Sequence, residues 1–513
     1  MARRAFGQKR SVDPRLIMAA AGVACFAAAH WVSADTIDEA QLPAGLNGSG
    51  VNVAIVEADS NPATTPDWYE VSPAAVTQPA SKFTYIDSGG GVSSTYSTTN
   101  HSANHADPVG DNFFGNDMYG VAPGVNHIDD YDAGYFINTL IPNSIATQNN
   151  DVVINQSFAD PNVSDEPELD YYYDLYVRAY PSTIIVSGAG GATNPYTPEA
   201  PGTAYNGISV NPAGMGGNGV TGPAADGLQD PDISAYANNT STPDASYATP
   251  MVSGSAAILV QAGAAGYGGS LSSTETAAQD PRVVKALLMN GAVKPSGWST
   301  GVTSTSPLNS YYGAGVLNIY NSFVNLENGL HSYVASSTQS AGTSAATYPT
   351  PAAGSSTDPM AGWILTSVTT TSTNSSIQHY VIPTSGSGSE TFTANMNWWS
   401  QPTADDPTYA DPINNIFLYL YDVTTSTGVA ESISTADNLQ EIYATVNAGN
   451  TYDLMVMKQG GIPGVTAGVI SNSDTYALAW SVPEPASFSL CLIGLPLLAA
   501  RRRRKTCLPI TQG

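Results

Sequence analysis

Cysteine is nearly absent from this sequence, because its 513 residues include only Cys25, Cys491 and Cys507. All three lie near the two ends of the chain, so the long central segment has none. Small exported domains are often held together by disulfides, and cysteine clusters commonly bind structural zinc. The composition therefore excludes disulfides and cysteine-bound zinc from the central segment, which must be stabilised by hydrophobic cores.

Basic residues are also scarce: there are 16 Lys and Arg against 42 Asp and Glu. Ten of the basic residues lie in the terminal segments, which leaves Asp35 to Val482 with a net charge of −34. Such a surface repels phosphate backbones, which excludes nucleic acid as a partner. It is compatible with structural calcium, although no ligand set stands out, and no cofactor is predicted to be required.

Long apolar runs are missing, but each end has a short one. The basic N-terminus is followed by Leu16 to Ala29 and then by Val32-Ser33-Ala34. This pattern predicts a secretory signal peptide over residues 1–34; the alternative, a membrane anchor, would need about 20 apolar residues. Only a short stretch separates Ala34 from the first expected strand, which predicts no inhibitory prodomain.

The C-terminus has three parts: Val482-Pro483-Glu484-Pro485, the apolar stretch Phe488 to Ala500, and the basic run Arg501 to Lys505. This tail, residues 483–505, resembles the PEP-CTERM sorting signal of Gram-negative bacteria. The resemblance implies transient membrane insertion with the basic residues inside, cleavage by an exosortase-type enzyme, and a secreted or cell-surface protein. An ordinary C-terminal membrane anchor is the alternative.

Between the two ends, apolar runs alternate with helical patterns, which is typical of an α/β domain with a mainly parallel sheet flanked by helices. We expect this domain over residues 45–325. Strands are predicted at Val51 to Val56, Val152 to Ile154, Ile184 to Val186 and Ile208 to Val210. Helices are predicted at Asp165 to Ala179, Ala248 to Gln261 and Pro281 to Met289.

A change in composition follows this domain. Residues 335–358 are rich in Ser, Thr, Ala, Gly and Pro and have no periodic apolar pattern, so they predict a linker. Beyond them, apolar residues from Phe392 to Trp398 and from Tyr452 to Val456 alternate with polar ones. This period predicts an antiparallel β-sandwich over residues 359–482.

The segment Asp244-Ala245-Ser246-Tyr247-Ala248-Thr249-Pro250 precedes an uncharged run of small and apolar residues. A serine here stands at the start of a buried helix, whose unpaired N–H groups can stabilise an oxyanion that forms beside the hydroxyl. Taken alone, a serine in this position is more often an ordinary helix cap.

The neighbouring residues resemble the nucleophile motif of the subtilase family of serine peptidases, with Asp244-Ala245 in place of Gly-Thr and Tyr247 in place of Met. Further segments resemble subtilase landmarks in family order: Gly120 to Gly124, Val153 to Ser157, Pro201 to Asn206 and Val284 to Leu288. The resemblance covers roughly Gly48 to Phe323 and implies a subtilisin-like fold, a protein or peptide substrate, and Ser246 as the nucleophile.

A serine nucleophile needs a histidine base and a carboxylate that orients it. Two histidines compete, and His105 is favoured over His101 because it directly precedes an expected helix with Pro108 in its first turn. The carboxylate is expected at the end of the first strand, where Glu57 stands in place of the family's Asp. Asp59 is the alternative.

The resemblance leaves the oxyanion donor in doubt, because Gly191 stands where the family has Asn, and Asn194 is the remaining candidate. Ser157, Phe158 and Ala159 resemble the substrate-lining edge segment of the family, which pairs with an extended peptide. The sequence therefore supports two hypotheses. One is a secreted endopeptidase, and the other is a catalytically impaired surface or matrix protein on the same scaffold.

Overall fold

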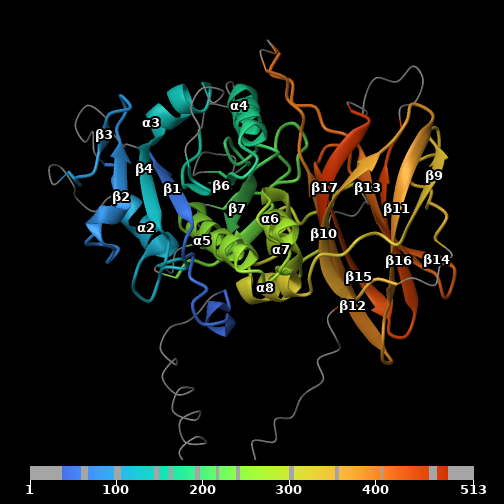
Figure 1. Ribbon diagram of the computed structural model, residues 1–513. Helices are drawn as coiled ribbons and strands as arrows, with labels where there is room; N and C mark the ends of the chain where they lie inside the picture. Colours follow the sequence, from blue (N-terminus) through green and yellow to red (C-terminus); the bar gives the residue numbers. More distant parts are fainter. Residues whose placement is uncertain are drawn as a thin grey trace, which may run out of the picture.

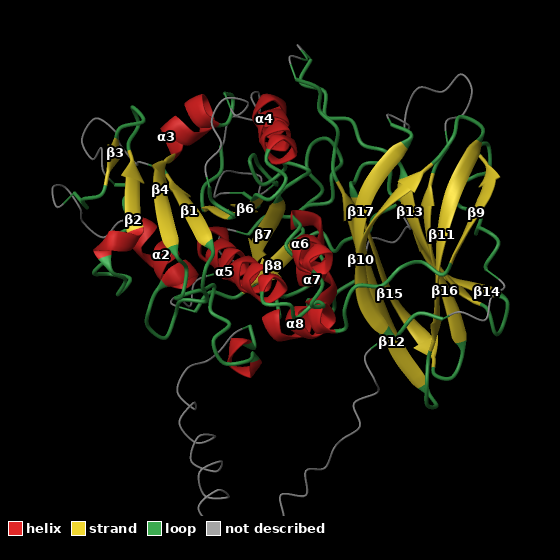
Figure 2. Ribbon diagram, in the orientation of Figure 1, coloured by secondary structure: helices red, strands yellow, loops and turns green. Residues whose placement is uncertain are grey.

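The computed structural model describes residues 37–58, 68–97, 105–143, 150–160, 166–190, 197–214, 219–238, 243–299, 305–352, 357–404, 406, 408–460 and 471–482. These residues build two regions, an α/β region and a β-sandwich, which lie side by side (Figures 1 and 2). The predicted signal peptide and C-terminal sorting signal lie outside the described residues. Within those ranges, no helix has the length and apolar character needed to cross a membrane.

The α/β region is built on an eight-stranded sheet with the order β3-β2-β4-β1-β5-β6-β7-β8. Every neighbouring pair is parallel except β2 and β3. The strands are β1 (Asn52–Glu57), β2 (Phe83–Ile86), β3 (Val92–Ser93), β4 (His127–Asp132), β5 (Val153–Gln156), β6 (Ile184–Gly188), β7 (Ile208–Pro212) and β8 (Ile233–Ala235). The predicted mixed α/β class with a mainly parallel sheet is therefore confirmed.

Both faces of this sheet are buried, which explains why its central strands are continuously apolar. Val53 and Ile55 of β1 contribute to a core shared with the long helix α5, whereas Ala54 and Val56 contribute to a second core on the opposite face. The helices are α2 (Ala106–Phe114), α3 (Ala133–Tyr135), α4 (Glu166–Ala179), α5 (Ala245–Ala264), α6 (Ser272–Ala278), α7 (Pro281–Gly291) and α8 (Ile319–Glu327). Short helical turns are η1 (Glu39–Gln41), η2 (Ala80–Lys82) and η3 (Phe136–Leu140).

Helix α5 runs through the centre of the region and packs against β5, β6 and β7. Its small residues make this position possible. A Cβ on Gly254 would lie 2.6 Å from the side chain of Val121, so only glycine permits this approach. Because α5 begins at the end of a loop above the sheet, its first turn delivers Ser246 to the edge where the parallel strands end.

The four strands and three helices predicted in this region are present, but β4 was not predicted. Its sequence, His127-Ile128-Asp129-Asp130-Tyr131-Asp132, contains three acidic residues and gives no apolar run. Asp130 is nevertheless completely buried. Its Oδ2 accepts a hydrogen bond from the Val71 N–H at 2.7 Å, which replaces part of the solvation that burial removes.

The β-sandwich has a four-stranded sheet, β10-β17-β12-β15, and a five-stranded sheet, β14-β13-β16-β11-β9, with antiparallel neighbours throughout. The strands are β9 (Ala335–Ser340), β10 (Ala361–Thr369), β11 (Asn374–Pro383), β12 (Ser389–Trp398), β13 (Ile416–Asp422), β14 (Thr427–Ser432), β15 (Leu439–Asn447), β16 (Thr451–Lys458) and β17 (Ser473–Ser481). An apolar core lies between the two sheets, as the alternating pattern predicts.

The predicted linker, residues 335–358, differs from the structure at its beginning. Ala335–Ser340 forms β9, an edge strand that pairs with β11. Its side chains alternate between half-buried and exposed, and none of the six is fully buried. Because backbone hydrogen bonds rather than a buried apolar face hold this strand, its composition gave no strand signal.

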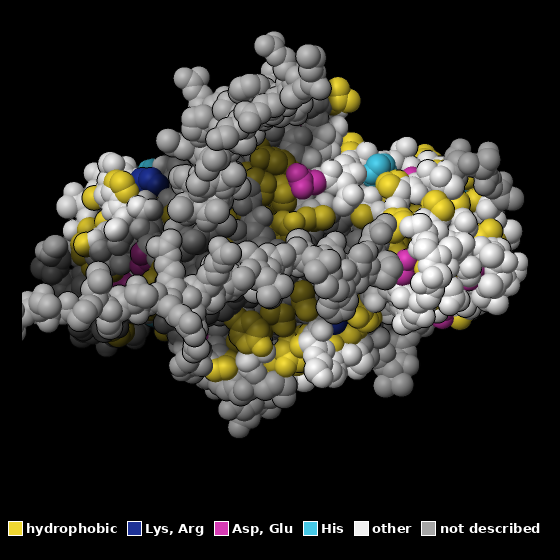
Figure 3. All heavy atoms as spheres, turned by 90° about the horizontal axis from the view of Figure 1, so that it is seen from below, with side chains coloured by type: hydrophobic (Ala, Val, Ile, Leu, Met, Phe, Trp, Pro, Cys, Tyr) yellow, Lys and Arg dark blue, Asp and Glu magenta, His cyan; other side chains and the backbone are white. Residues whose placement is uncertain are grey.

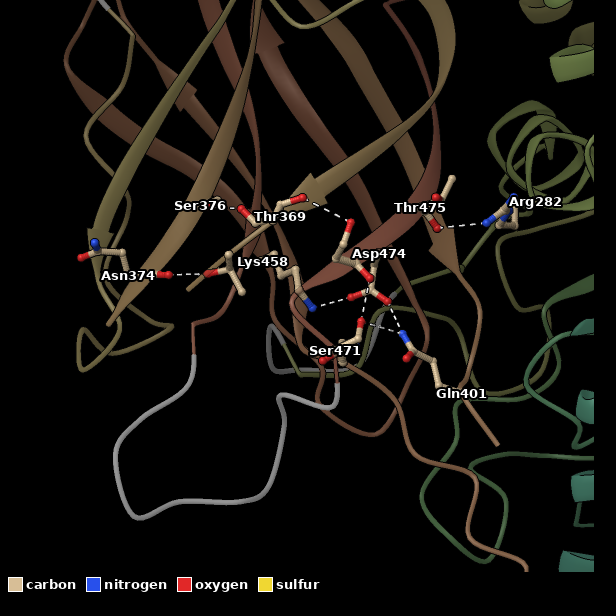
Figure 4. Close-up of polar contacts among 12 residues, drawn as sticks. Arg282, Thr369, Asn374, Ser376, Gln401, Lys458, Ser471, Asp474 and Thr475 are labelled. Atoms are coloured by element: carbon tan, nitrogen blue, oxygen red, sulfur yellow. Dashed lines mark hydrogen bonds and ion pairs between the residues drawn. The ribbon is translucent and has the colours of Figure 1, made fainter. Parts of the chain in front are cut away.

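The two regions share a tight junction, because α7 packs on β12 and β17 of the four-stranded sheet. The Arg282 guanidinium lies 3.9 Å from the ring centre of Trp399 and donates to the Thr475 carbonyl at 3.3 Å. Figure 4 shows the Arg282–Thr475 hydrogen bond and, near it, the buried Lys458–Asp474 ion pair, which joins one sheet of the sandwich to the other. In the view from below, hydrophobic side chains gather near this junction (Figure 3).

Candidate active site

Glu57 is the last residue of β1 and lies at the carboxyl end of the parallel sheet. Its side chain is 2% exposed. The strand is flanked by β4 and β5, so the carboxylate projects from the middle of the sheet rather than from its rim. A residue in this position is held by two neighbouring strands, which suits a group that must orient another side chain.

His105 immediately precedes α2, as predicted, and its Nδ1 lies 2.6 Å from Glu57 Oε2. The imidazole is 42% exposed, so it meets a buried carboxylate on one side and solvent on the other. Burial opposes protonation, but the charge and hydrogen bond of Glu57, together with the charge of Asp244, outweigh it and raise the pKa of His105. The alternatives His101 and Asp59 lie outside the described residues.

Asp130 of the adjacent strand β4 is the second buried carboxyl group near Glu57. Burial raises its pKa well above the usual range, and the negative charges of Glu70, Glu57 and Asp107 raise it further, against the hydrogen bond from Val71. The ionised form of Asp130 is therefore disfavoured. No sequence pattern indicated a second buried carboxyl group beside Glu57.

Ser246 lies in the first turn of α5, one residue before Tyr247. The Tyr247 and His105 rings stack with their centres 5.5 Å apart, which brings the histidine to the start of α5. Ser246 Oγ donates to the Ser157 carbonyl at 3.2 Å, and Ser157 Oγ donates to the Ser246 carbonyl at 2.8 Å. Among the hydrogen bonds of the described residues, none joins Ser246 to His105, so attack requires Ser246 Oγ to turn away from Ser157.

Asp244 caps α5, and its Oδ1 accepts the Ser246 N–H at 2.9 Å. That N–H is the backbone donor nearest to the Ser246 hydroxyl and would be needed for an oxyanion. A carboxylate in this place both occupies the donor and repels negative charge. The sequence showed Asp244 in place of glycine, but only the structure shows which N–H it binds. The predicted donor Asn194, like Gly191, lies outside the described residues.

Asn155 is a further residue that sequence reasoning did not single out. It is completely buried on β5, where its Nδ2 donates to Ser157 Oγ at 3.1 Å and its Oδ1 accepts from Ser253 Oγ at 2.9 Å. These bonds tie β5 to α5 and so fix Ser157 against Ser246. A polar residue directly after the apolar pair Val153 and Ile154 was the available signal.

The predicted substrate-lining residues follow β5. Ser157 is buried, while Phe158 and Ala159 are half-buried. The segment continues to Asp160, whose N–H donates to the Ala200 carbonyl at 2.7 Å. Its role in substrate binding stays a prediction, as does structural calcium. Within the described ranges, no group of three or more His, Cys, Asp or Glu residues is arranged to hold a metal ion.

Several of the solved structures that match this chain are serine proteases or are related to subtilisin. The serine protease of Aeromonas sobria, solved in complex with a chaperone, is 13% identical; the match covers 85% of this chain and 89% of that one, with a TM-score of 0.38. Fervidolysin from Fervidobacterium pennivorans, a keratinolytic enzyme related to subtilisin, is 12% identical over 85% and 77%, with a TM-score of 0.35. Pseudomonas sedolisin, a serine-carboxyl proteinase, is 14% identical over 57% and 94%, with a TM-score of 0.34.

No protein-family model matches the sequence, and no curated protein matches it. At the identities and TM-scores above, the likeness to solved structures carries no argument about activity. The assignment of a function therefore depends on the side chains described here.

Proposed function

We propose that this chain is a serine endopeptidase in which Ser246 is the nucleophile, His105 the base and Glu57 the group that orients His105. The observation that carries the proposal is the 2.6 Å contact between His105 Nδ1 and the buried carboxylate of Glu57, beside the first turn of α5. Because a carboxylate only accepts hydrogen bonds, Nδ1 carries the proton and Nε2 is left as the base.

In the proposed reaction, Ser246 Oγ leaves the Ser157 carbonyl and attacks the carbonyl carbon of a peptide bond, while its proton passes to His105 Nε2. The imidazolium is stabilised by Glu57 and gives the proton to the leaving amine. Water then hydrolyses the acyl-enzyme by the same route. The extended segment at Ser157, Phe158 and Ala159 is proposed to pair with the substrate backbone.

A fluorophosphonate probe tests this proposal, because it reacts only with an activated serine. We expect an adduct on Ser246 in the purified protein and none on that residue after Ser246→Ala. Ser272→Ala, which removes an exposed serine at the start of α6, is the matched control and should leave the labelling unchanged. Absence of Ser246 labelling, across a range of salt and calcium concentrations, would contradict the proposal.

A second candidate function is a non-catalytic surface or matrix protein on the same scaffold. Two observations favour it: Ser246 Oγ is bonded to the Ser157 carbonyl, and Asp244 occupies the Ser246 N–H. This candidate predicts no Ser246 adduct although the protein is folded. The same labelling experiment therefore separates the two functions.

We also propose that the protein is exported and sorted to the cell surface, which rests on residues 1–34 and 483–505 of the sequence. Mass spectrometry of the protein recovered outside the cytoplasm should find Asp35 as its first residue. It should also find that the chain ends near Pro483 to Pro485. An intact C-terminal tail on the recovered protein would contradict processing by an exosortase-type enzyme.

A further inference from the structure

A second set of serine, histidine and carboxylate lies in the β-sandwich, far along the chain from Ser246. His379 Nδ1 is 2.8 Å from Asp453 Oδ2, and His379 Nε2 is 2.7 Å from Ser337 Oγ. The three residues come from adjacent strands, because β11 lies between β16 and β9 in the five-stranded sheet. All three side chains project from the same face of that sheet.

The strand register explains this meeting. Ala335 pairs with His379 and Ser337 with Ile377, while Val381 pairs with Asp453. Paired residues in an antiparallel sheet share a face, and so do residues two apart on one strand. His379 therefore lies diagonally opposite Ser337 on one side and Asp453 on the other.

The hydrogen bonds have one consistent direction. As a carboxylate, Asp453 only accepts, so His379 Nδ1 donates to it and the neutral ring leaves Nε2 as an acceptor. Ser337 Oγ–H must then donate to Nε2. The Ala352 N–H also donates to Asp453 Oδ2, at 2.7 Å, so the oxygen that contacts His379 has a second hydrogen bond. This is the hydrogen-bonded order that a serine nucleophile requires.

Burial decreases along the set from the acid to the nucleophile. Asp453 is 0% and His379 is 1% exposed, whereas Ser337 is half-buried on β9. Because β9 is an edge strand, pairing with β11 alone among the described strands, alternate backbone N–H groups along it face away from the sheet. Such donors beside a serine are suited to an oxyanion.

A groove of about 580 Å³ lies at the same edge of the sheet, where the chain enters β9. It is lined by residues 330–334 and 357–359, including the exposed side chains of Leu330 and Tyr333. Val334, another lining residue, donates its N–H to the His379 carbonyl at 2.9 Å, so the groove adjoins the backbone of β11 at His379. Because more of its lining is polar than apolar, the groove suits a small ester with a short acyl group rather than a long acyl chain.

We propose that Ser337 is a second nucleophile, with His379 as its base and Asp453 as the residue that positions His379, and that it accepts acyl groups from small esters. Ser337 Oγ forms a bond to the acyl carbon while its proton passes to His379 Nε2. The ester C–O bond breaks, and the leaving alcohol takes the proton from His379. Water then releases the acid by the reverse transfers. This proposal is independent of the function proposed for Ser246.

The test uses the full chain with Ser246→Ala and a fluorophosphonate probe, which forms an Oγ–P bond as the P–F bond breaks and fluoride leaves. We expect an adduct on Ser337, located by mass spectrometry of the digest. Ser336→Ala is the matched control on the same strand, because Ser336 is exposed and lies outside the set. It should retain the Ser337 adduct, and Ser337→Ala should lose it.

His379→Gln in the Ser246→Ala chain tests the base, and we expect the Ser337 labelling rate to fall about 100-fold. A purely structural network would give no adduct on Ser337, or one that forms equally fast without His379, and either result overturns the proposal. If circular dichroism shows that His379→Gln does not fold, hydrolysis of p-nitrophenyl acetate by the Ser246→Ala chain decides. Hydrolysis that is lost when Ser337→Ala is added supports the proposal, and equal hydrolysis with and without Ser337 overturns it.

Discussion

The two serine-centred sets in this chain differ in which hydrogen bond is made and in how far solvent reaches the histidine. In the α/β region the histidine–carboxylate bond is present and the imidazole is 42% exposed, but Ser246 Oγ is bonded elsewhere. In the β-sandwich both bonds are present, but His379 is 1% exposed.

This difference shows that connectivity and access are separate requirements for a serine nucleophile. Ser246 lies in the first turn of α5, where solvent reaches His105 but the serine hydroxyl is bonded to the Ser157 carbonyl instead of the histidine. Strand pairing holds Ser337 against its histidine but covers the base. The Ser337 set, although its hydrogen bonds are complete, is therefore not necessarily more reactive than the Ser246 set.

The largest expected effect is the loss of the base at the first site. His105→Gln should lower the rate of Ser246 labelling and of peptide cleavage by about 10²- to 10⁴-fold, because Ser246 then has no group to take its proton. Ser337 labelling in the same molecule should not change. His127→Gln, which alters a half-buried histidine of β4 outside both sets and outside the groove, is the control. Equal Ser246 labelling in His105→Gln and the unaltered protein would contradict the assignment of the base.

Removal of the charge on Glu57 should have the next largest effect. Glu57 raises the pKa of His105 above its ordinary value of 6.5, so the unaltered site loses its neutral base as the pH falls through a value above 6.5. Glu57→Gln should shift this acid limb of the Ser246 labelling profile to lower pH and reduce the plateau rate about 100-fold.

Glu57→Asp is the matched variant for that measurement. It keeps the charge but shortens the side chain, so it should retain more of the pKa effect than Glu57→Gln while lengthening the 2.6 Å contact. An acid limb at the same pH in all three proteins would show that Glu57 does not act on the base.

Much of the first site could be predicted because its residues follow local signals. Glu57 ends an apolar strand, His105 precedes a helix with proline in its first turn, and Ser246 opens a run of small residues. The sequence showed that Asp244 replaces the glycine of the family motif. It could not show which backbone N–H the carboxylate accepts, because that depends on the backbone torsion angles at the start of α5. Asn194 lies outside the described residues, so its role stays a prediction.

The second set could not be predicted, because its residues meet through strand register rather than through local sequence. Ser337 lies in a segment whose composition indicates a linker, and His379 and Asp453, although on neighbouring strands of the sheet, are 74 residues apart in the sequence. A shift of one residue in either pairing would turn their side chains to opposite faces. Strand β4 was missed for a different reason, since its buried Asp130 gives a polar pattern where the fold has a central strand.

Asp244→Gly should increase the reactivity of Ser246 and so make the two sites more alike. It frees the Ser246 N–H for an oxyanion and removes a negative charge from the same place. One such donor is worth about 10²–10³ in turnover, and we expect at least a roughly 10-fold faster Ser246 labelling. Helix stability should fall by only a few tenths of a kcal/mol, because glycine is tolerated as a cap.

The matched control is Asn318→Gly, which removes a comparable cap from α8, where Asn318 accepts the Asn321 N–H at 2.9 Å. It should leave Ser246 labelling unchanged. Slower labelling in Asp244→Gly than in the unaltered protein would show that the carboxylate assists Ser246 instead of occupying its oxyanion donor.

The smallest expected effect is on stability, at the contact between the α/β region and the sandwich, where Asp437 accepts the Gln229 N–H. Burial raises the pKa of Asp437 to about 7, against hydrogen bonds from Ser434 and Gln229, and the charges of Asp232 and Asp226 raise it further. In the unfolded chain this carboxyl group has its ordinary pKa of 3.8. Between pH 3.8 and about pH 7 the folded state therefore keeps a proton on Asp437 that the unfolded chain has lost. Its contribution to the free energy of unfolding is therefore complete below pH 4 and is lost as the pH rises to about 7.

Asp437→Asn should reduce this pH dependence, because the amide oxygen can still accept the Gln229 N–H, bonded at 2.6 Å, without a charge. The unaltered protein should have a lower melting temperature at pH 8 than at pH 5, by roughly 2–4 °C for each kcal/mol lost, and the variant a smaller decrease. Calorimetry at the two pH values measures both. Burial also raises the pKa of Glu441 to about 7, although the charge and hydrogen bond of Lys294 oppose it. Because Glu441 titrates in the same range, the melting temperature of the variant should still fall partly between pH 5 and pH 8. An identical decrease in the two proteins would locate the titrating groups elsewhere than at Asp437.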